Sequence, residues 1–198
     1  MPDRPPQDFE ADFLVSRIQM TSAGTGISHS EYNRNKSDQV HFLQIWVQPS
    51  ASRLNPKYYT RSFSDEEKKD KLVQIVAPLS SEVSGVVDER EGTGPVPIHA
   101  PVSVYASILS PAATVEHHFP TPASGDSQRK AYVHVIQTSG YNKRAALSKS
   151  KGGARVTIND GLELGEGDGA FATGSTGDKL EIKNVGEGNV EFLVFDIE

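Results

Sequence analysis

Apolar and polar residues alternate over short stretches in the second half of the chain. The stretches with apolar residues at every second position are 102–108, 131–135, 156–158 and 180–182, and an apolar run follows at 190–197. Side chains two apart on a strand share a face, so each stretch predicts a strand with one buried face. Short strands separated by turn residues are typical of an all-β sandwich or barrel. We expect enough strands here for one complete barrel.

The first half of the chain is less regular. Its start, 1–12, is rich in proline and charge and predicts a poorly ordered lead-in, after which a first strand is expected to begin at 13–20. Residues 40–47 are apolar on both faces, which predicts a strand covered on both sides. Within that strand, His41 and Trp46 are expected to pack in the interior with their polar atoms satisfied.

A short helix and several polar loops are also predicted. Ser64 and Glu67 have the spacing of a capping box, which predicts a short exposed helix. Residues 80–94 are polar and acidic without periodicity, which indicates a flexible insertion. Two more polar loops are expected at 121–128 and 139–153. The second carries four basic residues that we expect to be solvated rather than to form a binding patch: Lys143, Arg144, Lys149 and Lys151.

These segments suggest a division of the chain into domains. The predicted parts are a disordered lead-in at 1–12, a partial N-terminal unit at 13–78, a flexible insertion at 79–95 and a C-terminal barrel at 96–198. The C-terminal part is expected to fold as a stable barrel, because its strands are sufficient to enclose a core.

Composition narrows the classes of protein. The chain has 26 acidic and 20 basic side chains and a pI near 5.5, so it offers no general attraction to nucleic acid or to an anionic membrane. It has no cysteine, which excludes disulfides and thiolate-bound metal. No apolar run approaches the roughly 20 residues of a membrane span, and the start lacks the pattern of a signal peptide. We expect a soluble intracellular protein, located in the cytoplasm, that makes no direct contact with nucleic acid or membrane.

The candidate chemistry lies at 19–33, QMTSAGTGISHSEYN. Gly24 and Gly26 allow a sharp turn, and His29 and Glu31 follow it two residues apart. If 27–32 forms a strand, the imidazole and the carboxylate point the same way and make half of a site for Fe(II), Mn(II) or Zn(II). The same spacing also suits a pair that merely hydrogen-bonds across a sheet, because H-x-E is a common triplet.

Other ionisable residues are weaker candidates. The second half carries four that attract attention, namely Glu116, His117, His118 and His134. Adjacent histidines on a strand face opposite ways, so His117 and His118 cannot serve one site unless the strand bulges. Asp168 lies between two glycines, which is typical of a tight turn. Glu10 and Asp12 also stand two apart, but in the lead-in, where ligands would not be held rigidly.

The run GTGISHSE around the candidate pair resembles the second metal motif of the pirin family, which are iron-binding proteins made of two cupin barrels. The resemblance extends over VHFLQIWVQP (40–49), PKYYTRSFSDEEKKDKL (56–72), PIHAPVSVYASIL (97–109), KAYVHVI (130–136) and LGEGDGAF (164–171). It implies an all-β fold of cupin, or jelly-roll, barrels with short helices. One barrel is expected to be complete and C-terminal, and the other partial and N-terminal.

One part of the family pattern is missing. Pirins carry an H-x-H motif on upstream strands, and no histidine precedes His29 here. The resemblance therefore implies that His29 and Glu31 are the remaining metal ligands, that Fe(II) or another divalent transition metal binds weakly, and that the C-terminal barrel has no metal. The open half-barrel would expose an apolar face around Phe42, Ile45 and Trp46, through which the chain could pair with a protein partner or with a second copy.

Three functions are compatible with this resemblance. The first is that of a quercetin 2,3-dioxygenase-like enzyme, in which a metal binds a flavonol hydroxyl and Glu31 takes its proton. We leave open whether this chain is an enzyme, and expect it to be inactive or impaired by itself because two protein ligands rarely hold a transition metal firmly. The second is that of a metal-dependent nuclear transcription cofactor or redox sensor. The third is a degenerate paralogue without metal chemistry, or a fragment from an erroneous gene model.

Overall fold

The structure is a computed structural model that describes residues 17–33, 36–37, 40–79, 86–122, 124–125, 128–137, 153–159 and 161–198. Within these ranges the regular structure is almost entirely strand, which confirms the all-β class. The elements are β1 (Arg17–Ser22), β2 (Lys57–Ser62), α1 (Asp65–Lys68), β3 (Val73–Pro78), β4 (Val96–Ile98), β5 (Val102–Leu109), β6 (Thr114–His118), β7 (Arg129–Val135), β8 (Arg155–Ile158), β9 (Leu162–Gly165), β10 (Gly169–Gly174), β11 (Lys179–Asn184) and β12 (Val190–Ile197).

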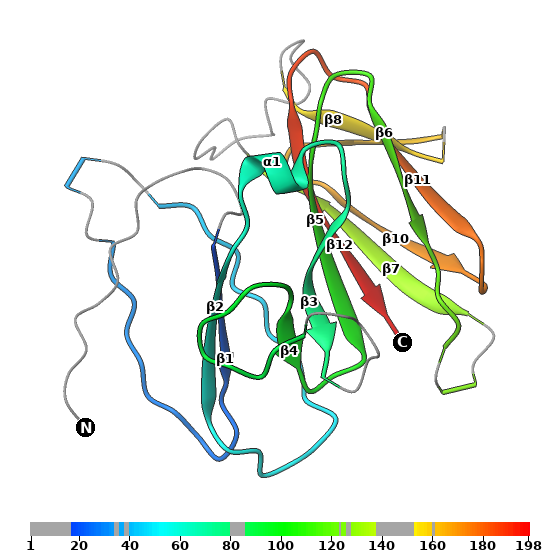
Figure 1. The fold of residues 1–198 in the computed structure, drawn as a ribbon. Coiled ribbons are helices and arrows are strands. Elements are labelled where there is room, and N and C mark those ends of the chain that lie inside the picture. The colour runs from blue at the N-terminus through cyan, green and yellow to red at the C-terminus, as the bar shows by residue number, and fades with distance from the viewer. Residues whose placement is uncertain are drawn as a thin grey trace.

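The strands form three sheets. A six-stranded sheet has the order β10-β7-β12-β5-β3-β4, a four-stranded sheet has the order β6-β11-β8-β9, and β1 pairs with β2 in a separate two-stranded sheet. Figure 1 shows the two larger sheets together on one side of the molecule and β1 and β2 on the other. The larger sheets are the two halves of a jelly-roll barrel, as the sequence alternation predicts.

The barrel core lies between the two larger sheets. Its inward-facing side chains come from strands of both sheets and include Val133, Val156, Ile182, Phe192 and Val194, each at most 1% exposed. A second apolar cluster covers the opposite face of the six-stranded sheet, where Ile18 and Met20 of β1 pack against it. Each fully buried aliphatic or aromatic side chain contributes roughly 1.5–3 kcal/mol of transfer free energy, so this packing holds the barrel and β1 together.

The strands predicted at 27–32 and 40–47 are wrong. Neither segment pairs with another strand in the described part of the chain, and both are largely exposed. Trp46 is 87% exposed and His41 is also exposed, so the expected interior packing of these two side chains is wrong as well. Alternation and apolar content give a segment the potential to be a strand, but a strand also needs a neighbour for its backbone groups.

The capping box is confirmed. The Ser64 hydroxyl accepts from the Glu67 backbone N–H at 3.3 Å, and the Glu67 carboxylate accepts from the Ser64 backbone N–H at 2.7 Å. The helix that follows is a single turn, and it is not wholly exposed. Lys68 is fully buried, and its ammonium lies 3.5 Å from the buried carboxylate of Glu191 on β12. The helix is thereby attached to the barrel.

The segments between the predicted domains are closely joined to their neighbours. β3 ends at residue 78, the last residue of the predicted N-terminal unit, yet it lies within the six-stranded sheet between β5 and β4. The described part of the predicted insertion, 86–94, runs beside β2, where Thr60 and Glu91 form an isolated bridge. Asp88 accepts hydrogen bonds from the Lys57 ammonium at 2.5 Å and from the Tyr59 hydroxyl at 2.6 Å. Residues 80–85 and the four basic residues of the later loop lie outside the described residues.

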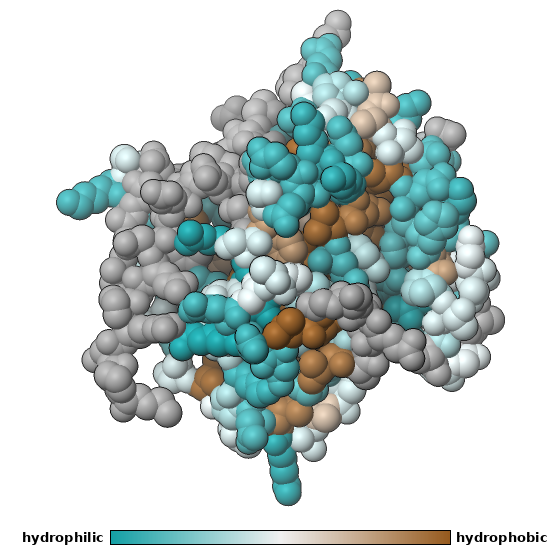
Figure 2. All heavy atoms as spheres, in the orientation of Figure 1, coloured by the Kyte–Doolittle hydropathy of each residue, from teal (hydrophilic) through white to brown (hydrophobic). Residues whose placement is uncertain are grey.

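The surface differs from one part of the chain to the other. The face drawn in Figure 2 is mostly polar, with apolar residues gathered in a few patches near its centre. Most of the large apolar side chains that are exposed belong to the N-terminal segment, and those of 40–47 are Phe42, Leu43, Ile45, Trp46 and Val47. The apolar face expected around Phe42, Ile45 and Trp46 is therefore exposed in the isolated chain.

Candidate metal-binding site

The glycine-rich turn before the candidate pair requires its glycines. Gly24 and Gly26 have φ angles of +52° and +126°, a backbone region that other residues rarely adopt. The Gly26 N–H donates to the Ala23 carbonyl at 2.8 Å and closes the turn. A Cβ at Gly24 would collide with the carbonyl oxygen of Leu54, because the turn packs against the chain at that point. The turn thereby sets the direction in which the next residues leave β1.

His29 and Glu31 lie beside each other after this turn. The His29 Nε2 and Glu31 Oε1 atoms are 3.9 Å apart, and the two side chains are 56% and 49% exposed. Metal–ligand distances for such groups are about 2.0–2.2 Å, so both atoms can reach one divalent ion after a small rotation of these exposed side chains. The donor set of one imidazole and one carboxylate suits Fe(II), Mn(II) or Zn(II).

The pair provides half of a coordination sphere. Among the described residues, no group of three or more His, Asp or Glu side chains is arranged to hold a metal. Glu10 and Asp12, the alternative ligands considered from the sequence, lie outside the described residues. A complete site would therefore need ligands beyond those that the structure describes.

The adjacent histidines of β6 face opposite ways, as predicted. His117 is 4% exposed and points into the barrel, where its Nε2 atom lies 3.1 Å from Asp196 Oδ2. The Asp196 carboxylate also accepts from Arg129 Nε at 2.6 Å, and Arg129 Nη1 donates to Glu198 at 2.9 Å. His118 points outward and lies 3.5 Å from Glu116. The contact between His117 and Asp196 joins β6 of the four-stranded sheet to β12 of the six-stranded sheet.

The surroundings of His134 and Asp168 differ from those of His117. The pKa of His134 is lowered, first because the half-buried ring is desolvated and second because of the nearby charge of His41. The His134 ring stacks on Tyr132 with a centroid distance of 6.2 Å. His41 therefore brings the N-terminal segment close to β7. Asp168 accepts from the Gly165 N–H at 2.9 Å within the turn between β9 and β10, which confirms its structural role.

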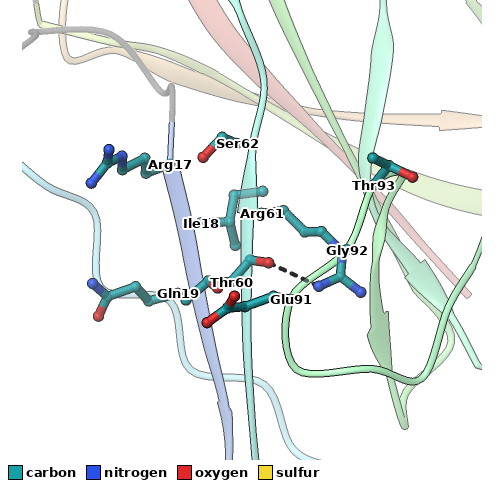
Figure 3. A pocket seen from close by; sticks show the side chains of 9 residues that line it. All are labelled: Arg17, Ile18, Gln19, Thr60, Arg61, Ser62, Glu91, Gly92 and Thr93. Carbon is teal, nitrogen blue, oxygen red and sulfur yellow. Dashed lines mark hydrogen bonds between the residues drawn. The ribbon is translucent and has the colours of Figure 1, made fainter. Parts of the chain in front are cut away.

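Sequence reasoning missed one functional candidate, Arg61. Its side chain is 2% exposed and contributes to a pocket between β1, β2 and residues 91–93 (Figure 3). A signal was present in the sequence, because Tyr59, Arg61 and Phe63 stand two apart and share a face that is otherwise apolar. All three are buried, at 3%, 2% and 5% exposure.

Comparison with known proteins identifies the segment that contains His29 and Glu31. The family model for Pirin matches residues 13–47, which include the turn, His29 and Glu31. A quercetin 2,3-dioxygenase of Escherichia coli is 25% identical over 183 residues, covering 92% of this chain and 62% of its own. A Zymomonas mobilis protein, whose name assigns that activity only provisionally, is 34% identical over 118 residues, 60% of this chain and 43% of its own. These comparisons show that the chain is similar to members of the pirin family.

Solved pirin structures share its fold. The crystal structure of YhhW from Escherichia coli has a TM-score of 0.64 and 24% identity, and the match covers 91% of this chain and 59% of that one. The same bacterial pirin in complex with nickel(II) gives a TM-score of 0.62, with coverage of 92% and 61%. The chain spans about half of the length of the curated relatives it matches. No helix in the described part of the chain is both long and apolar enough to cross a membrane.

Proposed function

We propose that this pirin-like chain contributes a metal-dependent, quercetin 2,3-dioxygenase-like site, with Fe(II) as the metal and a flavonol-type small molecule as the substrate. The observation that supports the proposal most directly is the pairing of His29 and Glu31 at 3.9 Å behind a turn that packs against Leu54. This pair lies within the residues that match the family model. The name of the Escherichia coli relative provides the substrate class, and the nickel(II) complex of a bacterial pirin supports metal binding.

The two side chains have distinct roles in this proposal. His29 holds the metal through Nε2, and Glu31 holds it through one carboxylate oxygen. A divalent ion in this position supplies a Lewis acid that lowers the pKa of a hydroxyl bound beside it. Glu31 then accepts the hydroxyl proton on its carboxylate, which makes it the general base. Both side chains are about half exposed, so a planar substrate can reach them.

Metal binding by this chain is proposed to be weak. Transition-metal sites in proteins commonly use three or four protein ligands, and this pair provides two. The 198-residue chain should therefore contain much less than one iron per molecule after gel filtration, and it should consume oxygen with quercetin only at the background rate.

The chain offers a matched control for this experiment. His118 and Glu116 form another exposed pair and, like His29 and Glu31, stand two residues apart in sequence. Their side chains are 58% and 37% exposed, and His118 Nε2 lies 3.5 Å from Glu116 Oε2. The Glu116 carboxylate accepts from the Lys179 ammonium at 2.7 Å, so it is less available to a metal. Elemental analysis should show that His29→Ala removes the residual iron, whereas His118→Ala retains it.

Two outcomes would contradict this proposal in different ways. Equal loss of iron from both variants would show that the metal binds non-specifically to exposed histidines. A content near one iron per chain that His29→Ala abolishes would show that other residues complete the site, and that binding is not weak. If a fully loaded chain then failed to oxidise quercetin, a metal-dependent regulatory role would replace the enzymatic one.

A further inference from the structure

The segment that carries the candidate metal pair is open to contact with another molecule. Every residue of 23–33 is exposed, and Ile27 and Tyr32, which flank the pair in the sequence, are 40% and 63% exposed. Figure 1 shows this segment leaving β1 along the side of the molecule that faces away from the two larger sheets. The described part of the chain therefore does not cover His29 and Glu31, and a second protein molecule can approach them.

The pair offers two ligand atoms that are not used on each other. His29 Nε2 and Glu31 Oε1 lie 3.9 Å apart, which is longer than a hydrogen bond. In the described part of the chain, no third histidine, aspartate or glutamate is placed to join them at one metal ion. Zinc sites built from protein ligands are commonly four-coordinate. One chain therefore supplies half of a four-ligand set.

A second copy of the chain supplies the same two ligands. A two-fold axis through the metal would bring two imidazoles and two carboxylates to one ion, and such a contact uses the same patch on both copies. The charges then balance, because histidine binds metal as the neutral ring and Glu31 is the only charged side chain in 23–33. Two carboxylates and one divalent cation sum to zero, so the shared site leaves no charge unpaired at the contact.

The same charge count makes the contact depend on metal. Without metal, the two Glu31 carboxylates would face each other across the axis, and like charges at an interface are costly. Each chain also carries a net charge of −6, which opposes association at low salt. The side chains of Ile27 and Tyr32 cannot provide the roughly 800 Å² per partner of a standard interface. Metal coordination must therefore supply most of the affinity between the two copies.

We propose that two copies of this chain share one divalent transition metal, with His29 and Glu31 of both copies as its four protein ligands. The inference rests on the proposed function, because it uses the same pair, and it adds the partner that completes the site. The shared site saturates at one metal ion per two chains. It empties on dilution, because formation of the dimer depends on the protein concentration.

The test follows the mass of the full 198-residue chain during a titration with Zn(II). Zn(II) is the probe because it has no redox chemistry and favours four ligands. An ionic strength of about 0.15 M screens the repulsion between the two acidic chains. Sedimentation velocity should show a monomer of 21.5 kDa in the presence of EDTA and a doubled mass with Zn(II), complete at one ion per two chains.

Matched variants locate the contact between the copies. His29→Ala removes two of the four ligands at once and should abolish the Zn(II)-dependent dimer. His118→Ala removes the exposed histidine of the pair on β6 and should dimerise like the original chain. Both histidines are exposed, so both substitutions should preserve the fold. A Zn(II)-dependent dimer that persists in His29→Ala would overturn the proposal, because the metal would then join the copies elsewhere.

The ring resonances of His29 separate this inference from the proposed function. We expect Zn(II) to shift these NMR resonances over the same range of concentration in which the mass doubles. A shift of the His29 resonances while the mass stays at one chain would overturn the shared site and leave metal binding by the single pair in place. No shift at His29, with the mass unchanged, would overturn both.

Discussion

Two histidine–carboxylate pairs, His29–Glu31 and His117–Asp196, are held in opposite surroundings. The first pair is separated by 3.9 Å and is about half exposed, whereas the second is separated by 3.1 Å and is at least 96% buried. Asp196 also receives a hydrogen bond from Arg129 at 2.6 Å. The same two chemical groups are therefore exposed to solvent in one region and closed in a buried network in the other.

This difference indicates what each region contributes. A buried carboxylate whose oxygens already accept from Arg129 and contact His117 has little capacity for a ligand, but its removal would leave charge stranded in the core. An exposed pair contributes little to stability because water competes for both groups. The same exposure leaves His29 and Glu31 available to a metal. The barrel should thus account for stability, and the N-terminal segment for binding.

The largest expected effect is at Asp196. Asp196→Ala should lower the free energy of unfolding by about 3–5 kcal/mol, because it leaves the buried guanidinium of Arg129 without its main partner. The control Glu163→Gln removes an exposed carboxylate that lies 3.2 Å from Arg155, and should cost only about 0–1 kcal/mol. Urea denaturation followed by circular dichroism measures both. A cost below about 1 kcal/mol for Asp196→Ala would remove the proposed contrast between the two regions.

A smaller effect is expected at His134, where the N-terminal segment approaches the barrel. The folded state lowers the pKa of this histidine through burial and the charge of His41, so folding favours the neutral ring. Its unfolded pKa is about 6.5. The resulting stability is present above that pH and is lost as the pH falls toward the lower folded-state value.

His134→Gln should therefore flatten the pH dependence of the free energy of unfolding below about pH 6.5. His41→Gln should raise the pKa of His134 toward its ordinary value without removing the effect of burial. An NMR titration of the His134 ring measures this pKa directly. An unchanged pKa in the His41 variant would show that the two rings do not interact in solution.

The smallest effect is expected at Trp46, the single tryptophan of the chain. Because this side chain is 87% exposed, Trp46→Ser should change the free energy of unfolding by no more than about 0.5 kcal/mol. Acrylamide should quench its fluorescence nearly as well as that of free indole. Protection from quenching that increases with protein concentration would instead indicate self-association through the 40–47 segment.

Much of the barrel could be predicted from the sequence, because its strands carry their own pattern. The alternation at 102–108 and 131–135 became β5 and β7. The apolar face of β7 lies in the barrel core as predicted, whereas β5 is buried on both faces and its alternating residues Val102, Val104 and Ala106 belong to the second apolar cluster. The same argument failed for 27–32 and 40–47. These segments have the composition of strands, but no neighbouring strand pairs with them in the described part of the chain, and pairing is not encoded within a single segment.

The surroundings of the candidate residues could also be predicted only in part from the sequence. His29 and Glu31 were expected to lie together on one face of a strand; they do lie 3.9 Å apart, but residues 27–32 do not form a strand, so strand geometry is not the reason for their proximity. The surroundings of His117 could not be predicted, because its partner Asp196 lies 79 residues further along the chain. Arg61 was missed for the same reason. Its hydrogen-bond acceptors at 87–90 include carbonyls 26–29 residues away, and nothing in the local sequence identifies them.

By itself, the sequence determined the features that depend on backbone geometry over a few residues. These include the capping box at Ser64, the glycine turn at Gly24 and the opposite orientations of His117 and His118. Only the tertiary structure decided which charged groups are buried and what balances them. Local features follow from steric limits on neighbouring residues, whereas buried charge is tolerated only where folding brings distant partners together and removes water from both.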